Sequence, residues 1–102
     1  MRLELRFFAN FREAVGQKTI YREYDDPTTV GEVLAALESE FEGLDLLDGG
    51  DIRSHINVLK NGREVLHLDG VDTALEEGDK LSVFPPVAGG RSRGRGRQRD
   101  AP

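Results

Sequence analysis

Residues 29–41 carry the strongest helix signal of the chain, and strand-like patterns lie on both sides of it. Thr29-Val30-Gly31-Glu32 has the spacing of a capping box, in which a threonine hydroxyl and a glutamate each satisfy a free backbone amide. Apolar residues then recur at three- and four-residue spacing, at Val30, Val33, Leu34, Leu37 and Phe41. We expect one helix here, ended by Gly43, with its apolar stripe facing a sheet.

Two strands are expected before this helix. Leu3, Leu5 and Phe7 alternate with charged residues, which predicts a half-buried strand over residues 2–7. Asn10-Phe11-Arg12-Glu13 predicts only a short helical turn capped by Asn10 and stopped by Gly16. Residues 18–24 are rich in strand formers and end at a turn over residues 25–27, so the two strands should pair antiparallel.

Three more strands are expected after the helix. Residues 43–54 mix leucines with glycines and acids, and we expect a mobile surface loop there. Residues 56–60 and 63–68 flank Asn61-Gly62, the signature of a tight hairpin. A turn over residues 76–79 precedes a strand over residues 80–84, buried on at least one face and ended by two prolines.

This order of elements predicts an α+β fold of one domain, since 102 residues leave no room for two. We expect a mixed sheet of four to five strands, with one main helix packed across one face. That is the β-grasp arrangement.

The composition excludes several kinds of chemistry. There is no cysteine, which excludes disulfides, thiolate nucleophiles, zinc-thiolate clusters and iron-sulfur sites and suits a reducing compartment. Charged residues interrupt the apolar ones over residues 1–6, so no signal peptide is predicted, and no run reaches membrane-spanning length. We expect a cytoplasmic protein without a membrane partner.

The charge is distributed unevenly. The net charge is −5, but residues 91–102 hold five arginines beside one acid, which leaves −9 on residues 1–90. An acidic body repels nucleic acid and anionic membranes and favours basic partners or a high-salt cytoplasm. Simple solubility explains the charge equally well.

The segment after the last strand reads Pro85-Pro86-Val87-Ala88-Gly89-Gly90. The prolines keep it extended, while the glycines lack Cβ atoms and allow a narrow channel to close around the backbone. Six extended residues reach roughly 20 Å, far enough to carry a carboxylate into the active site of another protein. The alternative interpretation is a disordered linker.

Three segments of the chain carry a family resemblance. Residues 6–13, 55–62 and 75–90 resemble the molybdopterin-synthase sulfur-carrier subunit and, more closely, the small archaeal modifier proteins of the ubiquitin-like group. The similarity spans essentially residues 1–90.

The resemblance implies that the protein is not an enzyme but the substrate of one. An E1-like activating enzyme would use ATP to adenylate the carboxylate of Gly90, so no cofactor is expected on the chain itself. A lysine amine would then give an isopeptide conjugate with a target protein, and a persulfide would give a thiocarboxylate. The thiocarboxylate would serve molybdopterin synthase, through its large subunit, or tRNA thiolation. The leading hypothesis is a protein modifier, and a dedicated sulfur carrier is the alternative.

The resemblance also assigns roles around Gly90. Recognition by the activating enzyme would involve the residues leading up to it: Gly89, Ala88, Val87, Pro86 and Pro85. Phe84 resembles a partner-facing aromatic residue, although a core residue at a strand end is an equal alternative.

The chain departs from the family pattern after Gly90, because residues 91–102 follow it. We expect a β-grasp domain over residues 1–88, a reactive end at 89–90 and a disordered tail at 91–102. A protease, such as a processing or deconjugating metalloprotease, would cut between Gly90 and Arg91. The tail resembles arginine-glycine segments that bind RNA, which leaves a non-covalent RNA-binding module as a second alternative. It has no aromatic residue, and a solvated tail or one folded back on the acidic body is also open.

Other candidate sites are weaker. His55 and His67 lack a clear third ligand, so we expect no metal site. No glycine motif for nucleotide binding follows a strand. The three lysines are candidate modification sites or ordinary surface residues: Lys18, Lys60 and Lys80.

Overall fold

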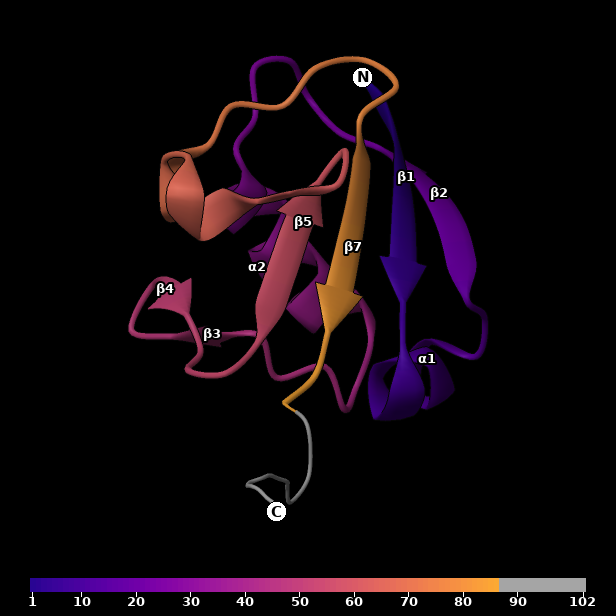
Figure 1. Ribbon diagram of the computed structural model, residues 1–102. Helices are drawn as coiled ribbons and strands as arrows, with labels where there is room; N and C mark the ends of the chain where they lie inside the picture. The colour runs from indigo at the N-terminus through magenta and orange to yellow at the C-terminus, as the bar shows by residue number, and fades with distance from the viewer. Residues whose placement is uncertain (87–102) are drawn as a thin grey trace.

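The computed structural model describes residues 1–86 and shows a five-stranded mixed sheet crossed by one helix (Figure 1). The strand order is β2-β1-β7-β5-β6. β1 and β7 run parallel at the centre, and the other neighbours pair antiparallel. The strands are β1 (Arg2–Phe7), β2 (Thr19–Glu23), β5 (Asn57–Lys60), β6 (Arg63–Glu64) and β7 (Lys80–Phe84). This is the predicted α+β, ubiquitin-like β-grasp arrangement.

Alternation in the two central strands decides which face of the sheet is buried. Leu3, Leu5 and Phe7 of β1 and Leu81 and Val83 of β7 are fully buried, while the residues between them lie on the outer face. The last strand is therefore buried on one face, as predicted. The core continues through both helices, the neighbouring strands and the connecting segments, with Phe11, Ile20, Val30, Val33, Leu34, Leu37, Leu44, Leu46, Ile56, Val58, Val65 and Leu75.

The predicted helix is confirmed as α2 (Val30–Glu40). Thr29 Oγ1 accepts a hydrogen bond from the Glu32 amide at 3.3 Å, and the Glu32 carboxylate accepts one from the Thr29 amide at 3.2 Å. Both halves of the capping box are thus formed. The helix ends at Glu40 with Phe41 in an extended conformation, so Gly43 lies beyond its end and does not stop it.

The first helix differs from the prediction of a short turn capped by Asn10. α1 (Ala9–Val15) is seven residues long, and its cap position is Phe8, which makes no side-chain cap bond. Phe11 is buried in the core and holds the helix, so packing replaces capping as its support. The helix ends at Gly16, which has the positive φ of +90° that the prediction required.

The prediction of an irregular mobile loop over residues 43–54 is wrong. β3 (Leu47–Asp48) and β4 (Asp51–Ile52) form a small antiparallel ribbon. The Glu38 carboxylate accepts hydrogen bonds from the Leu46 amide at 2.6 Å and the Leu47 amide at 2.9 Å. Leu46 is fully buried. The ribbon is therefore fastened to the end of α2 by contacts between residues eight and nine positions apart.

The Asn-Gly hairpin is confirmed, but its second strand is shorter than predicted. Asn61 and Gly62 have φ values of 51° and 86°, as a tight primed turn requires. β6 spans only two residues, and the chain then enters two short 3₁₀ helices, η1 (Val65–His67) and η2 (Gly70–Asp72). Val65 is fully buried, which turns the chain away from the sheet edge.

Two further predictions concern membrane-spanning segments and the end of the chain. No helix within residues 1–86 combines the length and apolar character needed to cross a membrane. The domain boundary at residue 88 and the tail at 91–102 lie outside the described part of the chain.

Candidate functional site

The predicted reactive end lies just past the described residues. Gly90, Gly89, Ala88 and Val87 are outside them, whereas Pro85 and Pro86 are within them and follow β7 directly. β7 is paired on both sides, with β1 and with β5, so the segment that leads to Gly90 starts from the middle of the sheet. Figure 1 shows this exit at the end of the molecule opposite the N-terminus.

Phe84 does not belong to the core. Leu81 and Val83 of the same strand are fully buried in the core, and Phe84 lies half-buried on the outer face. Its ring stacks on that of Phe8, with 4.1 Å between ring centroids and 9° between ring planes. Of the two interpretations left open by the sequence, this placement favours a surface that a partner can reach.

A hollow lies beside the stacked rings. It has a volume of about 490 Å³ and opens at the base of the C-terminal segment. The ammonium group of Lys18 lies 5.7 Å from the centre of the Phe8 ring, at the edge of this region. The hollow is lined by Phe8, Ala9, Asn10, Asn57, Phe84, Pro85 and Pro86.

Sequence reasoning missed Phe8 as a part of this site. The signal was the pair Phe7-Phe8, because adjacent residues of a strand face opposite sides and both cannot enter the core. Phe7 is fully buried and Phe8 lies on the outer face against Phe84. Pro85, Pro86, Phe8 and Phe84 thus form an apolar platform beside the exit of the chain, which we call the exit platform.

The three lysines differ in their surroundings. Lys60 Nζ donates a hydrogen bond to the Ala74 carbonyl at 2.9 Å and lies 3.6 Å from the Asp79 carboxylate, with 22% of its side chain exposed. Lys18 is exposed beside the exit platform, and Lys80 is half-buried on the outer face of the sheet. Lys60 is engaged in holding loops together, while Lys18 is the most accessible of the three.

The two histidines are exposed: His55 lies in the turn before β5, and His67 lies at the end of η1. Among residues 1–86, no three potential ligating side chains of the His, Cys, Asp and Glu types come together to hold a metal ion.

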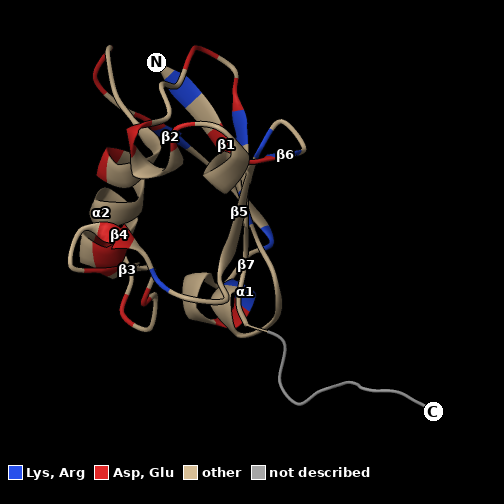
Figure 2. Ribbon diagram, turned by 60° about the vertical axis from the view of Figure 1, so that its left-hand side comes forward, with Lys and Arg blue, Asp and Glu red and all other residues tan. Residues whose placement is uncertain are grey.

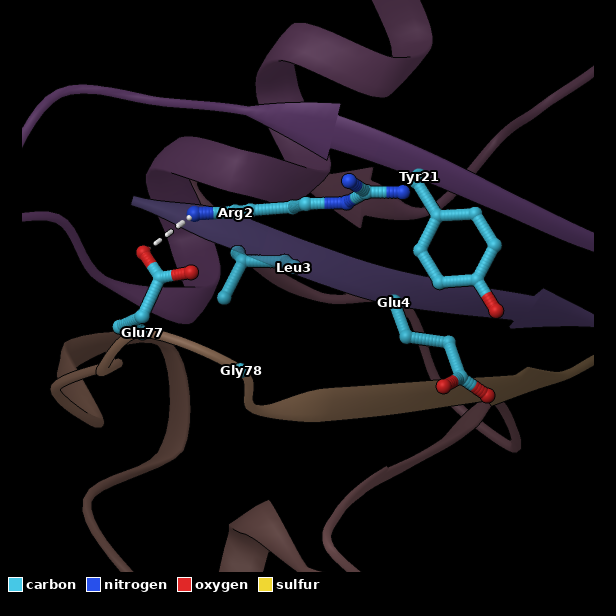
Figure 3. A pocket seen from close by; sticks show the side chains of 6 residues that line it. All are labelled: Arg2, Leu3, Glu4, Tyr21, Glu77 and Gly78. Atoms are coloured by element: carbon cyan, nitrogen blue, oxygen red, sulfur yellow. Dashed lines mark hydrogen bonds between the residues drawn. The ribbon is translucent and has the colours of Figure 1, made fainter.

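A second, smaller hollow lies at the far end of the sheet (Figure 3). The Arg2 guanidinium lies 4.8 Å from the centre of the Tyr21 ring, and the Arg2 amide donates a hydrogen bond to Glu77 at 2.9 Å. Arg2 is flanked by Glu4 and Glu77, so the hollow carries charges of both signs and favours no ligand class.

Comparison with known proteins identifies the family. The chain matches the ThiS family over residues 5–90. It is 64% identical to Small archaeal modifier protein 3 of Haloferax volcanii over 92 residues, which cover 88% of this chain and all of that one. It is 32% identical to the sulfur carrier protein CysO of Mycobacterium tuberculosis over 80 residues, 74% of this chain and 83% of that one.

The fold agrees with these relationships. The solution structure of the Haloferax volcanii HVO 2177 protein superposes with a TM-score of 0.81 at 64% identity, covering 87% of this chain and 86% of that chain. The fold and the sequence point to the same group of proteins. The chain belongs to the ThiS family and is a ubiquitin-like protein of the modifier and sulfur-carrier type.

Proposed function

We propose that this protein acts as an acyl carrier in the cytoplasm, where ATP is available, and that its reactive group is the carboxylate of Gly90 once residues 91–102 have been removed. The observation that carries the proposal is that the family match ends at residue 90, at the second glycine of the pair. All of Small archaeal modifier protein 3 aligns with 88% of this chain. The twelve residues after Gly90 are thus an addition to the matched domain.

The first step is activation by an E1-like enzyme. The Gly90 carboxylate attacks the α-phosphorus of ATP, which forms an acyl adenylate and releases pyrophosphate. A carboxylate is a poor acyl donor, and the adenylate supplies the leaving group that the next step needs. Every catalytic group belongs to the activating enzyme, so this chain contributes only the carboxylate and the surface that presents it.

The second step depends on the nucleophile. A lysine amine of a target protein displaces AMP and gives an isopeptide bond, with loss of the amine proton. A persulfide displaces AMP and gives an acyl disulfide, which a thiol then reduces to the thiocarboxylate. Similarity to small archaeal modifiers supports the first outcome, and similarity to a sulfur carrier supports the second. The sulfur would pass to molybdopterin synthase, through its large subunit, or to tRNA.

The exit platform is the proposed contact with the activating enzyme. Phe8 and Phe84 present an apolar surface with a hollow of about 490 Å³, next to two prolines that restrict the backbone. Partly buried aromatic residues beside a pocket are the usual anchors of protein interfaces. The central position of β7 fixes this anchor relative to the point where the C-terminal segment begins, so docking on the platform would aim Gly90 at the catalytic groups.

Three forms of the chain test the proposal: full length, ending at Gly90, and ending at Gly89. Within residues 1–86, every buried core residue lies at or before Val83, so none of these ends removes that core. Each form is incubated with ATP and an extract of its own cells, and its intact mass and conjugates are measured. We expect the form ending at Gly90 to gain an adenylate, an exchange of oxygen for sulfur, or conjugates carrying Gly90 on lysines.

The form ending at Gly89 is the matched control and should stay unmodified. The full-length form should react only after it loses residues 91–102, which the same mass spectra report. Conjugates that retain these residues, or an inert form ending at Gly90, would contradict the proposal.

A further inference from the structure

A third hollow shares no lining residue with the hollow beside the exit platform. It is formed where α2, η2 and the β3–β4 ribbon meet, and its volume is about 440 Å³. Ala35, Leu47 and Val71 supply apolar surface, while Glu32 and Asp72 supply carboxylates. We call this hollow the helix groove; the remaining residues along it are Thr29, Gly31 and Gly50.

The groove depends on a close approach of η2 to α2. A Cβ atom at Gly31 would lie 3.0 Å from the Cβ of Val71 and 3.2 Å from its carbonyl oxygen, so a larger residue would press η2 away from α2 by a few tenths of an ångström. The approach places Asp72 beside the first turn of α2, where Glu32 also lies. The result is an apolar hollow with two carboxylates along it.

The surroundings of the groove are acidic and almost without cations. Residues 25–52 contain nine Asp and Glu residues and no Lys or Arg. Figure 2 shows acidic residues gathered over α2 and the β3–β4 ribbon. The nearby cations Arg22 and Arg53 are already paired, with Glu40 and Asp45. None of the four ion pairs within residues 1–86 involves Glu32 or Asp72.

The chain itself contains a segment of matching chemistry. Residues 91–102 carry five arginines at every second position from Arg91 to Arg99. An arginine combines an aliphatic stem, which packs on apolar surface, with a guanidinium that forms paired hydrogen bonds to carboxylates. The groove offers both kinds of partner side by side.

The tail is long enough to reach the groove. The thirteen residues from Val87 to Arg99 span at most roughly 45 Å when extended. A folded domain of this size has a radius of gyration of about 12 Å, so the tail can cross the molecule. Because the tail is tethered to the domain, it acts at an effective concentration on the order of millimolar. Contacts that are too weak to bind a separate peptide can therefore hold the tail.

We propose that the arginine tail, residues 91–102, docks in the helix groove of its own molecule, with an arginine stem over Leu47 and Val71 and its guanidinium between Glu32 and Asp72. Nucleic acid is disfavoured as an occupant because the carboxylates repel phosphates. Docking holds the segment after Gly90 against the body of the protein, and cleavage after Gly90 opens the groove. The inference concerns the full-length chain and does not depend on any activating enzyme.

Paramagnetic broadening in the full-length chain tests the docking. Because the chain has no cysteine, Ser92→Cys introduces a single site for a nitroxide label. At low ionic strength, we expect the amide signals of Gly31, Ala35, Gly50 and Val71 to lose at least half of their intensity. In about 1 M salt, where the screening length falls to roughly 3 Å, they should recover.

Two charge variants locate the contact. Glu32→Gln with Asp72→Asn removes the groove carboxylates, and glutamine keeps the capping box because it also accepts the Thr29 amide. Glu13→Gln with Glu23→Gln removes the same charge from exposed positions in α1 and β2. The first pair should abolish the broadening, and the second should leave it unchanged.

Several outcomes would overturn the proposal. Broadening spread evenly over the body, or equally weakened by both pairs of substitutions, would show only general charge attraction. A control mixes isotope-labelled chains without nitroxide with separate chains that carry the nitroxide. Broadening in this mixture that fades on dilution would show that the tail docks on another molecule. Broadening centred on the exit platform would place the tail elsewhere.

Discussion

Replacement of Phe84 by alanine tests the exit platform in two ways, through stability and through activation. Phe84 is half-buried, and its ring lies parallel to that of Phe8 at 4.1 Å. Stacked aromatic pairs contribute about 0.5–1.5 kcal/mol beyond the area they bury. We expect Phe84→Ala to lower the free energy of unfolding by about 1–2 kcal/mol, less than the 3–5 kcal/mol typical of a fully buried phenylalanine.

A double-mutant cycle isolates the contact between the rings. The free energies of unfolding of Phe8→Ala, Phe84→Ala and the double variant are measured by urea denaturation, and the pairwise coupling is taken from their difference. The expected coupling is about 1 kcal/mol, equivalent to roughly 4–8 °C in Tm for a domain of this size. A coupling indistinguishable from zero would show that the rings do not stack in solution.

The effect on activation should be larger than the effect on stability. Truncating a central aromatic anchor of an interface costs about 2 kcal/mol or more, which is roughly a 30-fold loss of affinity. Tyr21→Ala is the matched control, because Tyr21 is an aromatic residue on the same outer face, 50% exposed, and distant from the exit. Adenylation of the form ending at Gly90 is measured as pyrophosphate release against protein concentration. An equal loss in both variants would refute the role of the exit platform.

Three further predictions concern the scaffold. Thr29→Ala removes the capping box and should lower the free energy of unfolding by about 1 kcal/mol, as measured in urea. Glu38→Ala frees two amide groups of the β3 segment and should cost about 2 kcal/mol, with faster hydrogen exchange in the ribbon, whereas the exposed control Glu42→Ala should change little. Burial raises the pKa of Tyr24, so the folded state keeps its proton longer than the unfolded chain and stability should fall as the pH rises above about 10. Tyr24→Phe should reduce that fall; a pH profile identical to that of the unsubstituted protein would argue against the buried environment of Tyr24.

Local signals in the sequence predicted most of the elements and their order. The alternation in β1, the capping box before α2 and the Asn-Gly turn each depend on neighbours within a few residues, and all three are present. The failures occur where distant contacts decide the structure. The ribbon β3–β4 is held by Glu38, whose carboxylate accepts hydrogen bonds from amides eight and nine positions further along the chain. Likewise, β6 is cut short by the burial of Val65, which no turn signal marks.

The sequence predicted which segment of the chain forms the candidate site, but it did not predict the surface beside that segment. Pro85, Pro86 and the glycine pair follow one another in the sequence, so composition alone pointed to them. The partnership of Phe8 and Phe84 joins residues 76 positions apart, and it exists because β1 and β7 are parallel neighbours. The strand order decides which strands become neighbours, and the patterns within separate segments do not reveal that order.

The parallel pairing of β1 and β7 has a practical consequence for handling the protein. Because the two strands run in the same direction, Met1 lies at one end of the sheet and Pro86 leaves at the other, about 20 Å away along six residues of β1. An affinity tag, dye or surface tether fused before Met1 is thereby kept clear of the chain end where the chemistry is proposed. Immobilisation through the amino terminus is the arrangement of choice for capturing partners.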